Sequence, residues 1–118
     1  MANTFKVITR DVMSATANTD ETLYTTQSGS TVVIIGMTIA NVHTAQVTAT
    51  VKLQSTTTQT SQTANTTAHI VKDIPVPVGS TVEIMSGNKI ILNAGDIIKV
   101  ACSVADKVSV IMSYMEIT

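Results

Sequence analysis

The chain has 118 residues and a formal net charge of −1, with 44% apolar and 13% charged residues, whereas an average soluble domain has about 25% charged residues. This length fits one domain with its own core. The charge balance, with Arg10 as the only arginine and scattered lysines, argues against a nucleic-acid partner, which requires clustered cations.

Membrane insertion and secretion are also not expected. No apolar run approaches the roughly 20 residues of a membrane helix, and the N-terminal residues lack the apolar segment of a secretory signal. The chain should be made and fold in a reducing cytoplasm. The only cysteine, Cys102, excludes an intrachain disulfide, and its apolar surroundings favour a buried small hydrophobe over a reactive thiol.

The N-terminal third predicts three strands. Residues 4–13 alternate imperfectly and predict an edge strand, with a helix as the alternative, and residues 1–20 as a whole form a candidate N-terminal arm. A short strand follows at residues 21–26. Residues 31–42 form the most apolar run, rich in Val and Ile, which is typical of a central strand or one buried on both faces. Gly36 within that run predicts a bulge or bend at which the strand changes sheets.

Residues 46–54 show the clearest alternation in the chain. The expected inward row is Val47, Ala49, Val51 and Leu53, with polar residues between them. The next segment, residues 55–66 (STTTQTSQTANT), has Ala64 as its only apolar residue. A segment of this kind cannot bury enough surface to offset its ordering entropy. We therefore expect a projecting loop that is flexible in the isolated subunit and is ordered by a neighbouring subunit.

Residues 67–74 predict the strand that returns from this loop. Pro75 and Pro77 then exclude a helix. Three short apolar runs follow at residues 81–85, 89–92 and 97–101, separated by the turn sequences SGN and NAGD. Strand, tight turn, strand predicts a meander in which these three strands pair consecutively.

The last strand is expected at residues 108–117, where apolar residues occupy both alternation sets. A strand of this kind must pair inside a sheet or against another chain. In total, about eight strands at short spacing predict an all-β fold, a single antiparallel β-sandwich of Ig-like or jelly-roll type that occupies residues 1–118.

The reactive side chains do not form a known catalytic or metal-binding spacing. His43 is expected at a turn, His69 in a strand, and Asp96 in a tight turn between two apolar strands that Gly and Asp favour. Asp73 and Glu83 are expected at the surface, although they would approach one another if their strands were neighbours. Met85, Met112 and Met115 are expected in the core or at an adaptable interface. We therefore expect no catalytic residue, no cofactor, no metal and no small-molecule substrate.

Two stretches carry a family resemblance. The sequence TLYTTQSGSTVVIIGMTIANV, and later PVPVGST, KIILNAGD and the terminal Tyr-x-Glu-Ile, resemble small β-sandwich virion structural proteins of tailed bacteriophages, including cyanophage-like marine phages. The resemblance covers residues 21–118. It departs from the family pattern at residues 55–66, and it does not extend to the first twenty residues.

The resemblance implies a non-enzymatic subunit, present in many copies in the virion and assembled in the host cytoplasm, at the neck, collar or tail. A ring or trimer of identical chains, in contact with other virion proteins, is the expected assembly, since a charge-poor surface suits packing against copies of itself. The alternatives are a capsid decoration protein on the phage head and a carbohydrate- or receptor-binding β module. Sugar binding usually relies on exposed aromatic rings. Only 3% of the residues in this chain are aromatic, which disfavours the carbohydrate-binding alternative.

Overall fold

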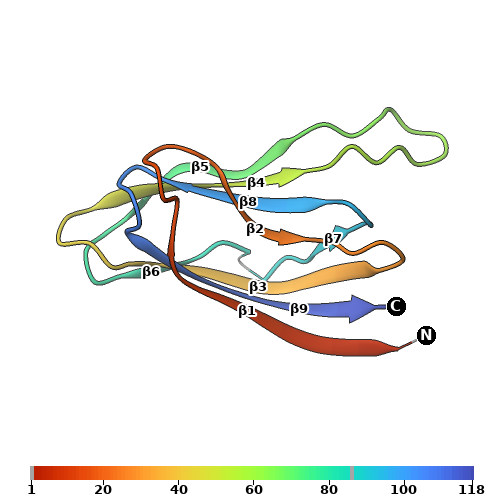
Figure 1. Cartoon of the computed structure of the whole chain (residues 1–118), viewed down its shortest axis with the longest axis horizontal. Coiled ribbons are helices and arrows are strands. Elements are labelled where there is room, and N and C mark those ends of the chain that lie inside the picture. Colours follow the sequence, from red (N-terminus) through yellow and green to blue (C-terminus); the bar gives the residue numbers. More distant parts are fainter. Residues whose placement is uncertain (1, 86) are drawn as a thin grey trace.

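The computed structural model describes residues 2–85 and 87–118, and within them the chain forms two packed antiparallel sheets without a helix (Figure 1). The prediction of an all-β sandwich is confirmed, with nine strands in place of about eight. Their bounds are β1 Asn3–Met13, β2 Glu21–Thr25, β3 Thr31–Asn41, β4 Val47–Gln54, β5 Ala68–Val76, β6 Thr81–Glu83, β7 Ile90–Leu92, β8 Ile97–Cys102 and β9 Val108–Ile117.

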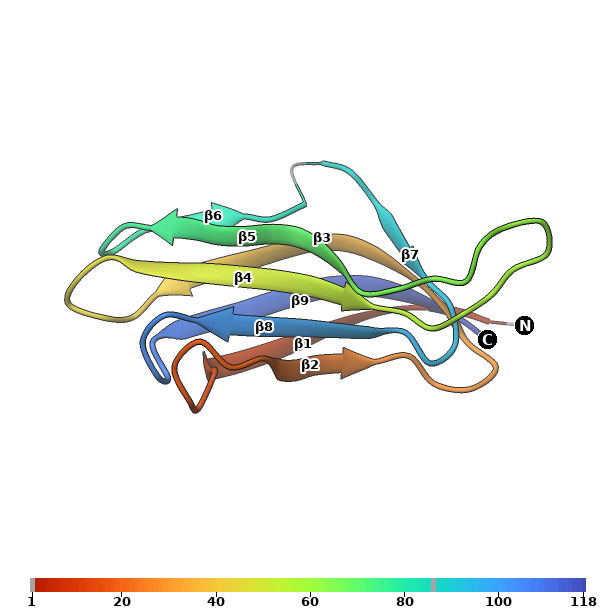
Figure 2. The ribbon, with the colours of Figure 1, turned by 90° about the horizontal axis from the view of Figure 1, so that it is seen from above.

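The strand order is that of a jelly roll. One sheet, sheet A, has the order β1-β9-β3-β6, and β7 also pairs with β3; the other, sheet B, has the order β2-β8-β4-β5. The chain thus wraps as one long folded hairpin, in which the first strand lies beside the last and β4 lies beside β5 (Figure 2). Of the two sandwich types that the sequence allowed, the pairing matches the jelly roll, which has eight strands in two sheets.

The ninth strand arises because one strand of the jelly roll is interrupted. β6 and β7 both run antiparallel to β3. β6 pairs with residues Thr38–Ala40 near the C-terminal end of β3, and β7 pairs with Val32–Ile34 near its N-terminal end. The predicted meander is therefore wrong, because β6 and β7 both pair with β3 and β8 lies in the other sheet. Three short apolar runs fit any exposed strand edge equally well, and β3 is long enough to pair with two of them.

The interruption coincides with a bulge in β3. The register of β3 against β9 shifts between Ile34 and Gly36, so the predicted bulge is confirmed, but β3 stays in one sheet throughout. The main-chain N–H of Met37, next to the bulge, donates to Glu83 Oε1 at 3.3 Å, and its carbonyl accepts from the N–H of Ile84 at 2.8 Å. The expected turn at residues 86–88 includes Ser86, which, like Met1, lies outside the described residues.

The core lies between the sheets and follows the predicted alternation. In β4, Val47, Ala49 and Val51 are buried and Leu53 is half-buried, while Thr48 and its alternate neighbours face out. β9 is central, between β1 and β3, so it finds both partners inside its own sheet. Cys102 is a buried free thiol that packs in the core, as predicted.

The two long edge strands are β1, at one edge of sheet A, and β5, at one edge of sheet B. β1 is a strand and not a helix, and the segment set apart as an N-terminal arm therefore lies in sheet A as far as Met13. β5 extends past the predicted residue 74 and includes Pro75, which an edge strand tolerates because its missing N–H can face solvent. No helix in the described part of the chain is long and apolar enough to cross a membrane.

The polar segment at residues 55–66 extends past the ends of both sheets (Figure 1). Its base is tied by hydrogen bonds, since Asn65 N–H donates to the carbonyl of Thr57 at 3.0 Å and Asn65 Nδ2 donates to Ser55 Oγ at 3.0 Å. Ser55 itself is buried. The loop therefore begins as a closed, hydrogen-bonded base, and its tip projects from the body of the domain.

Candidate interaction surfaces

The outer face of sheet A exposes apolar side chains from four strands. Register pairs place Phe5, Met115, Val33 and Ile91 in one row across β1, β9, β3 and β7. The next rows add exposed apolar residues, and we call the whole set the apolar outer face: Phe5, Val7, Val33, Ile35, Ile91, Ile111 and Met115.

Several side chains of the apolar outer face are largely exposed to solvent. Phe5 is 75% exposed, Val7 59% and Ile91 60%. A shallow hollow of about 300 Å³ is lined by Phe5, Lys6, Val7, Ile35, Ser113 and Tyr114. Isolated apolar residues are normal on a surface, but a contiguous patch that spans neighbouring strands indicates an interaction site.

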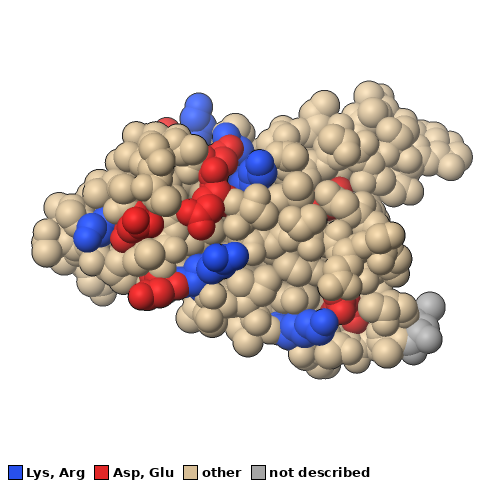
Figure 3. All heavy atoms as spheres, viewed as in Figure 1, with Lys and Arg blue, Asp and Glu red and all other residues tan. Residues whose placement is uncertain are grey.

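The charged side chains are distributed unevenly along the sandwich (Figure 3). In the view of Figure 3 the projecting loop shows no charged atom, and most of the acidic and basic groups gather at the opposite end of the sandwich. One ion pair near the chain ends is the exception, since Lys6 Nζ donates to Glu116 Oε1 at 2.7 Å. The Glu116 side chain is nearly buried while Lys6 is partly exposed.

This ion pair joins β1 to β9 and lies next to two tyrosine rings that contact one another. The rings of Tyr24, from sheet B, and Tyr114, from sheet A, have centroids 4.8 Å apart and are tilted by 44°. The hydrogen bond with Glu116 raises the pKa of Lys6. Burial, with smaller contributions from Tyr114 and Glu116, raises the pKa of Tyr24 to about 12. The Tyr24 hydroxyl is buried without a hydrogen-bond partner among the described residues.

We expect the free energy of unfolding to fall as the pH rises from 10.0, the ordinary pKa of tyrosine, through about 12. In that window the unfolded chain releases a proton that folded Tyr24 retains, so stability present below pH 10 is lost. Lys6 acts in the same direction above its ordinary pKa of 10.5. Urea unfolding across this range, together with tyrosinate absorbance, measures the effect.

Tyr24→Phe is the matched control. At neutral pH it should be as stable as the wild type or up to about 1 kcal/mol more stable, because it removes a buried hydroxyl that lacks a partner. It should also abolish the tyrosinate step near pH 12. An unchanged alkaline titration in this variant would show that another group is responsible.

A polar hollow lies on the outer face of sheet B. His69, Lys52 and Lys99 stand opposite one another on β5, β4 and β8, so basic side chains form a row across the sheet. Asp20 partly neutralises this row, since Lys52 Nζ lies 2.9 Å from Asp20 Oδ2. The hollow has a volume of about 170 Å³, and its lining includes Lys52, His69, Asp20, Lys72 and Asp73 but not Lys99.

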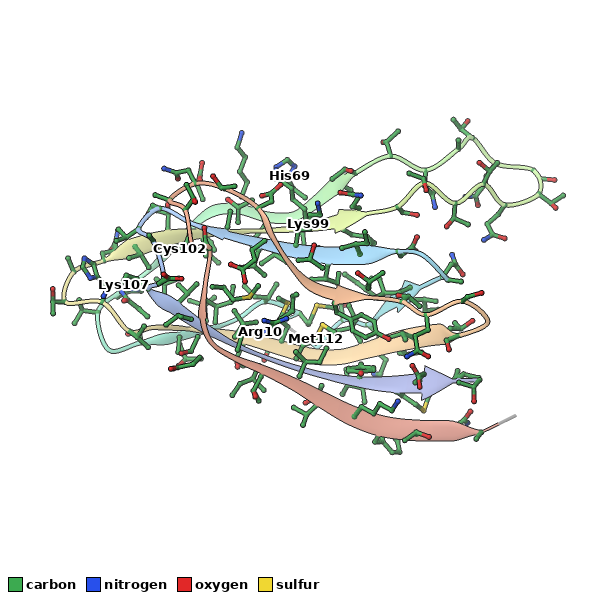
Figure 4. All side chains as sticks on the ribbon, viewed as in Figure 1. Arg10, His69, Lys99, Cys102, Lys107 and Met112 are labelled. Atoms are coloured by element: carbon green, nitrogen blue, oxygen red, sulfur yellow. The ribbon has the colours of Figure 1, made fainter. Side chains whose placement is uncertain are left out.

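The histidines and acidic residues that the sequence singled out are dispersed. His69 is exposed and points away from sheet B in Figure 4, whereas the N–H of His43, at the opposite end of β4, donates to Asn41 Oδ1 at 2.6 Å. Asp73 lies on β5 of sheet B and Glu83 on β6 of sheet A, so they are not neighbours within one sheet. Asp73 Oδ1 accepts from Thr50 Oγ1 at 3.4 Å.

The methionines divide between the two predicted roles. Met85 and Met112 are buried in the core, and Met112 lies between the sheets in Figure 4. Met115 is half-buried on the apolar outer face. Within residues 2–85 and 87–118, no group of three or more His, Cys, Asp or Glu side chains could hold a metal ion.

Asp96 lies in a turn, as predicted; the structure adds that it is buried and that it holds the projecting loop. Its Oδ2 accepts from the N–H of Asn93 at 2.9 Å, and its Oδ1 accepts from Thr57 Oγ1 at 3.1 Å. The second contact links the turn before β8 to the base of the loop at residues 55–66.

The sequence did not predict the ion pair between Lys6 and Glu116 or the basic row on sheet B. Lys6 and Glu116 come from opposite ends of the chain, and a charged residue within each apolar alternation is the only local signal. The basic row depends on which strands are neighbours, which the sequence does not state.

The comparisons with known proteins leave the family open. No family model and no curated protein matches this chain. Among solved structures, it is similar to a chain described with the words "Bacillus endospore appendages form a novel family of disulfide-linked pili", with 13% identity and a TM-score of 0.49 over 99% of this chain and 87% of that chain. At this identity and TM-score the likeness indicates neither a family nor a function for this chain.

Proposed function

We propose that this chain is a non-enzymatic structural subunit of a tailed-phage particle, at the neck, collar or tail, and that it associates with copies of itself. The observation that carries the proposal is the apolar outer face, with Phe5 and Ile91 both at least 60% exposed. In a monomer this face would remain in contact with water. A second copy of the chain presents a surface of the same chemistry and is the occupant that we assign to it.

Two further features support the proposal. On β1, β9 and β3, the rows of Asn3, Phe5 and Val7 carry no charge, whereas the row of Ile111 ends in Glu83 of β6. Over the three uncharged rows, two such faces can meet without burying an unpaired ion. The jelly-roll order is used by viral capsid domains, and also by lectins, so it agrees with a virion role by analogy only.

The test has two parts. Light scattering of the purified chain should give a mass above that of the monomer, and Ile111→Asp, which adds a charge to the apolar outer face, should lower that mass. Mass spectrometry of purified particles should then find a few to tens of copies per particle, relative to the major capsid protein. Hundreds of copies would indicate a capsid decoration protein or a tail-tube component, and absence from particles would contradict the virion proposal.

The polar hollow on sheet B favours a second candidate, a carbohydrate- or receptor-binding module. Its lining offers hydrogen-bond donors and acceptors, among them Asp20, Lys52 and His69. Binding of a monomeric chain to a glycan array, with loss of binding in Lys52→Ala, would support this candidate. A self-associated chain that binds no glycan would support the structural subunit.

A further inference from the structure

The outer edge of sheet A offers unpaired backbone groups along β1. The N–H groups and carbonyls of Ala2 and Thr118 bond to one another, at 3.2 and 3.0 Å, and the register of β1 with β9 is constant from Asn3 to Arg10. In an antiparallel ladder such bonded pairs alternate. The even-numbered residues of β1 therefore bond to β9, and the N–H and C=O groups of Phe5, Val7 and Thr9 point away from the sheet.

This edge is exposed and regular. All residues of β1 from Asn3 to Val12 are exposed except Ile8, which is half-buried. No described residue bonds to the backbone of Phe5, Val7 or Thr9. A long, regular edge with apolar side chains pairs with another strand unless proline, charge or a bulge blocks it. β1 has no proline, its register shift lies beyond Arg10, and the charge of Lys6 is paired with Glu116 of the same domain.

The other edges of the sandwich are poor partners for it. β6 and β7 have only three residues each. β2 has five residues, and its register against β8 shifts once. β5 contains Pro75, and its register against β4 shifts twice. Among the described strands, β1 itself is the one edge whose length and regularity match β1.

We infer that β1 pairs antiparallel with β1 of a second copy, across a two-fold axis at Val7. This inference rests on the self-association proposed above and names its geometry. Val7 would stand opposite Val7 of the second copy, and Phe5 opposite Thr9, so that the backbone groups at the free edge bond to one another. Sheet A of the two copies then becomes one continuous sheet. The two apolar outer faces lie side by side on the same side of that sheet.

The bulge in β1 fixes the centre of the pairing. The register shifts between Arg10 and Met13, and Ser109 Oγ donates to the carbonyl of Asp11, so the regular edge ends at Arg10. Residues 4–10 are centred on Val7. A two-fold axis at Phe5 would leave fewer residues of β1 paired between the two copies. An axis at Thr9 would place the bulge after Arg10 within the paired segment.

The charges on β1 exclude the remaining registers. An axis at Lys6 places this lysine opposite itself, and an axis at Ile8 places Lys6 opposite Arg10 of the second copy. Like charges directly opposite one another destabilise a sheet. With the axis at Val7, Lys6 stands opposite Ile8, and Arg10 stands opposite Thr4.

A two-fold contact of this kind is isologous and closes on itself. It differs from the head-to-tail contact of a simple ring, so larger assemblies would be built from dimers that meet through their apolar outer faces. The edge contact and the face contact can therefore be tested separately.

Cysteine cross-linking of the full chain tests the register. In the two-fold pair the Cα atoms of Val7 and its copy lie about 5.5 Å apart, which is within disulfide range. Val7→Cys should cross-link under mild oxidation. Phe5→Cys alone and Thr9→Cys alone should not, whereas a mixture of those two variants should; the buried Cys102 is common to all of them.

Proline substitution tests the edge contact itself. Val7→Pro removes an N–H that points away from β9, so the fold should remain while the dimer dissociation constant rises about tenfold or more. Val7→Thr keeps the N–H and should dimerise as the wild type does. If Val7→Pro fails to fold, the cross-linking pattern still decides.

The outcomes separate the two proposals. A wild type that associates, with no cross-link through Val7→Cys and no change in Val7→Pro, would overturn the edge pairing and leave self-association standing. Cross-linking of Phe5→Cys alone would overturn the register. A wild type that stays monomeric at all concentrations would overturn both.

Discussion

Val110→Asp should leave no soluble folded protein. Val110 is fully buried on β9, the central strand of sheet A, and it stands opposite Ile39 of β3. An aspartate there would bury an unpaired charge in a closely packed core, at a cost of at least about 4 kcal/mol. A domain of this size has a total stability of about 5–15 kcal/mol. Soluble yield and far-ultraviolet circular dichroism measure the outcome.

Ile111→Asp is the matched control, because it introduces the same residue one position further along the same strand. Ile111 is 49% exposed on the apolar outer face, so the substitution should lower the stability of the isolated subunit by no more than about 1 kcal/mol. If both variants fold, or if both fail to fold, the assignment of the two faces of β9 would be wrong, since a shift by one residue exchanges them.

Asp96→Ala should lower the free energy of unfolding by about 2–4 kcal/mol. Asp96 is only 2% exposed, and its carboxylate accepts from the N–H of Asn93 and from Thr57 Oγ1. Hydrogen bonds to a charged group contribute about 1.5–3 kcal/mol each. The loop at residues 55–66 should also exchange its amide hydrogens faster, because its base loses an anchor. Urea unfolding and hydrogen exchange measure the two effects.

Two further variants separate the two contacts. Asp96→Asn keeps one oxygen acceptor and should recover about half of the lost stability. Thr57→Val removes only the contact with the loop, so it should speed exchange in residues 55–66 with a loss of about 1 kcal/mol. An Asp96→Ala variant as stable as the wild type would contradict the role of this carboxylate in the turn.

Local alternation predicted the elements of this fold well. Three features followed from the neighbours of each residue in the sequence: the inward row of β4, the bulge at Gly36 and the burial of Cys102. For β9 the sequence left open a partner in the same sheet or in another chain, and the structure places it between β1 and β3. Alternation with a period of two records which face of a strand is buried, and that information is local.

The turn at Asp96 was predicted for the same reason, since Gly and Asp in sequence favour a tight turn. Its second role, as the anchor of the loop at residues 55–66, was not. The contact joins Asp96 to Thr57, which is 39 positions away, and neither residue carries a local sign of the other.

The sequence determined that this protein is a β-sandwich, which faces of its strands are buried, and where most strands begin and end. The tertiary structure decided which strands are neighbours. It placed β6 and β7 along β3 in place of a meander, left β1 at an open edge, and gathered Phe5, Val7 and Ile111 on one exposed face. The physical reason is that strands pair through backbone N–H and C=O groups, which every residue except proline carries alike. Side-chain order therefore fixes the faces of a strand but not its partner.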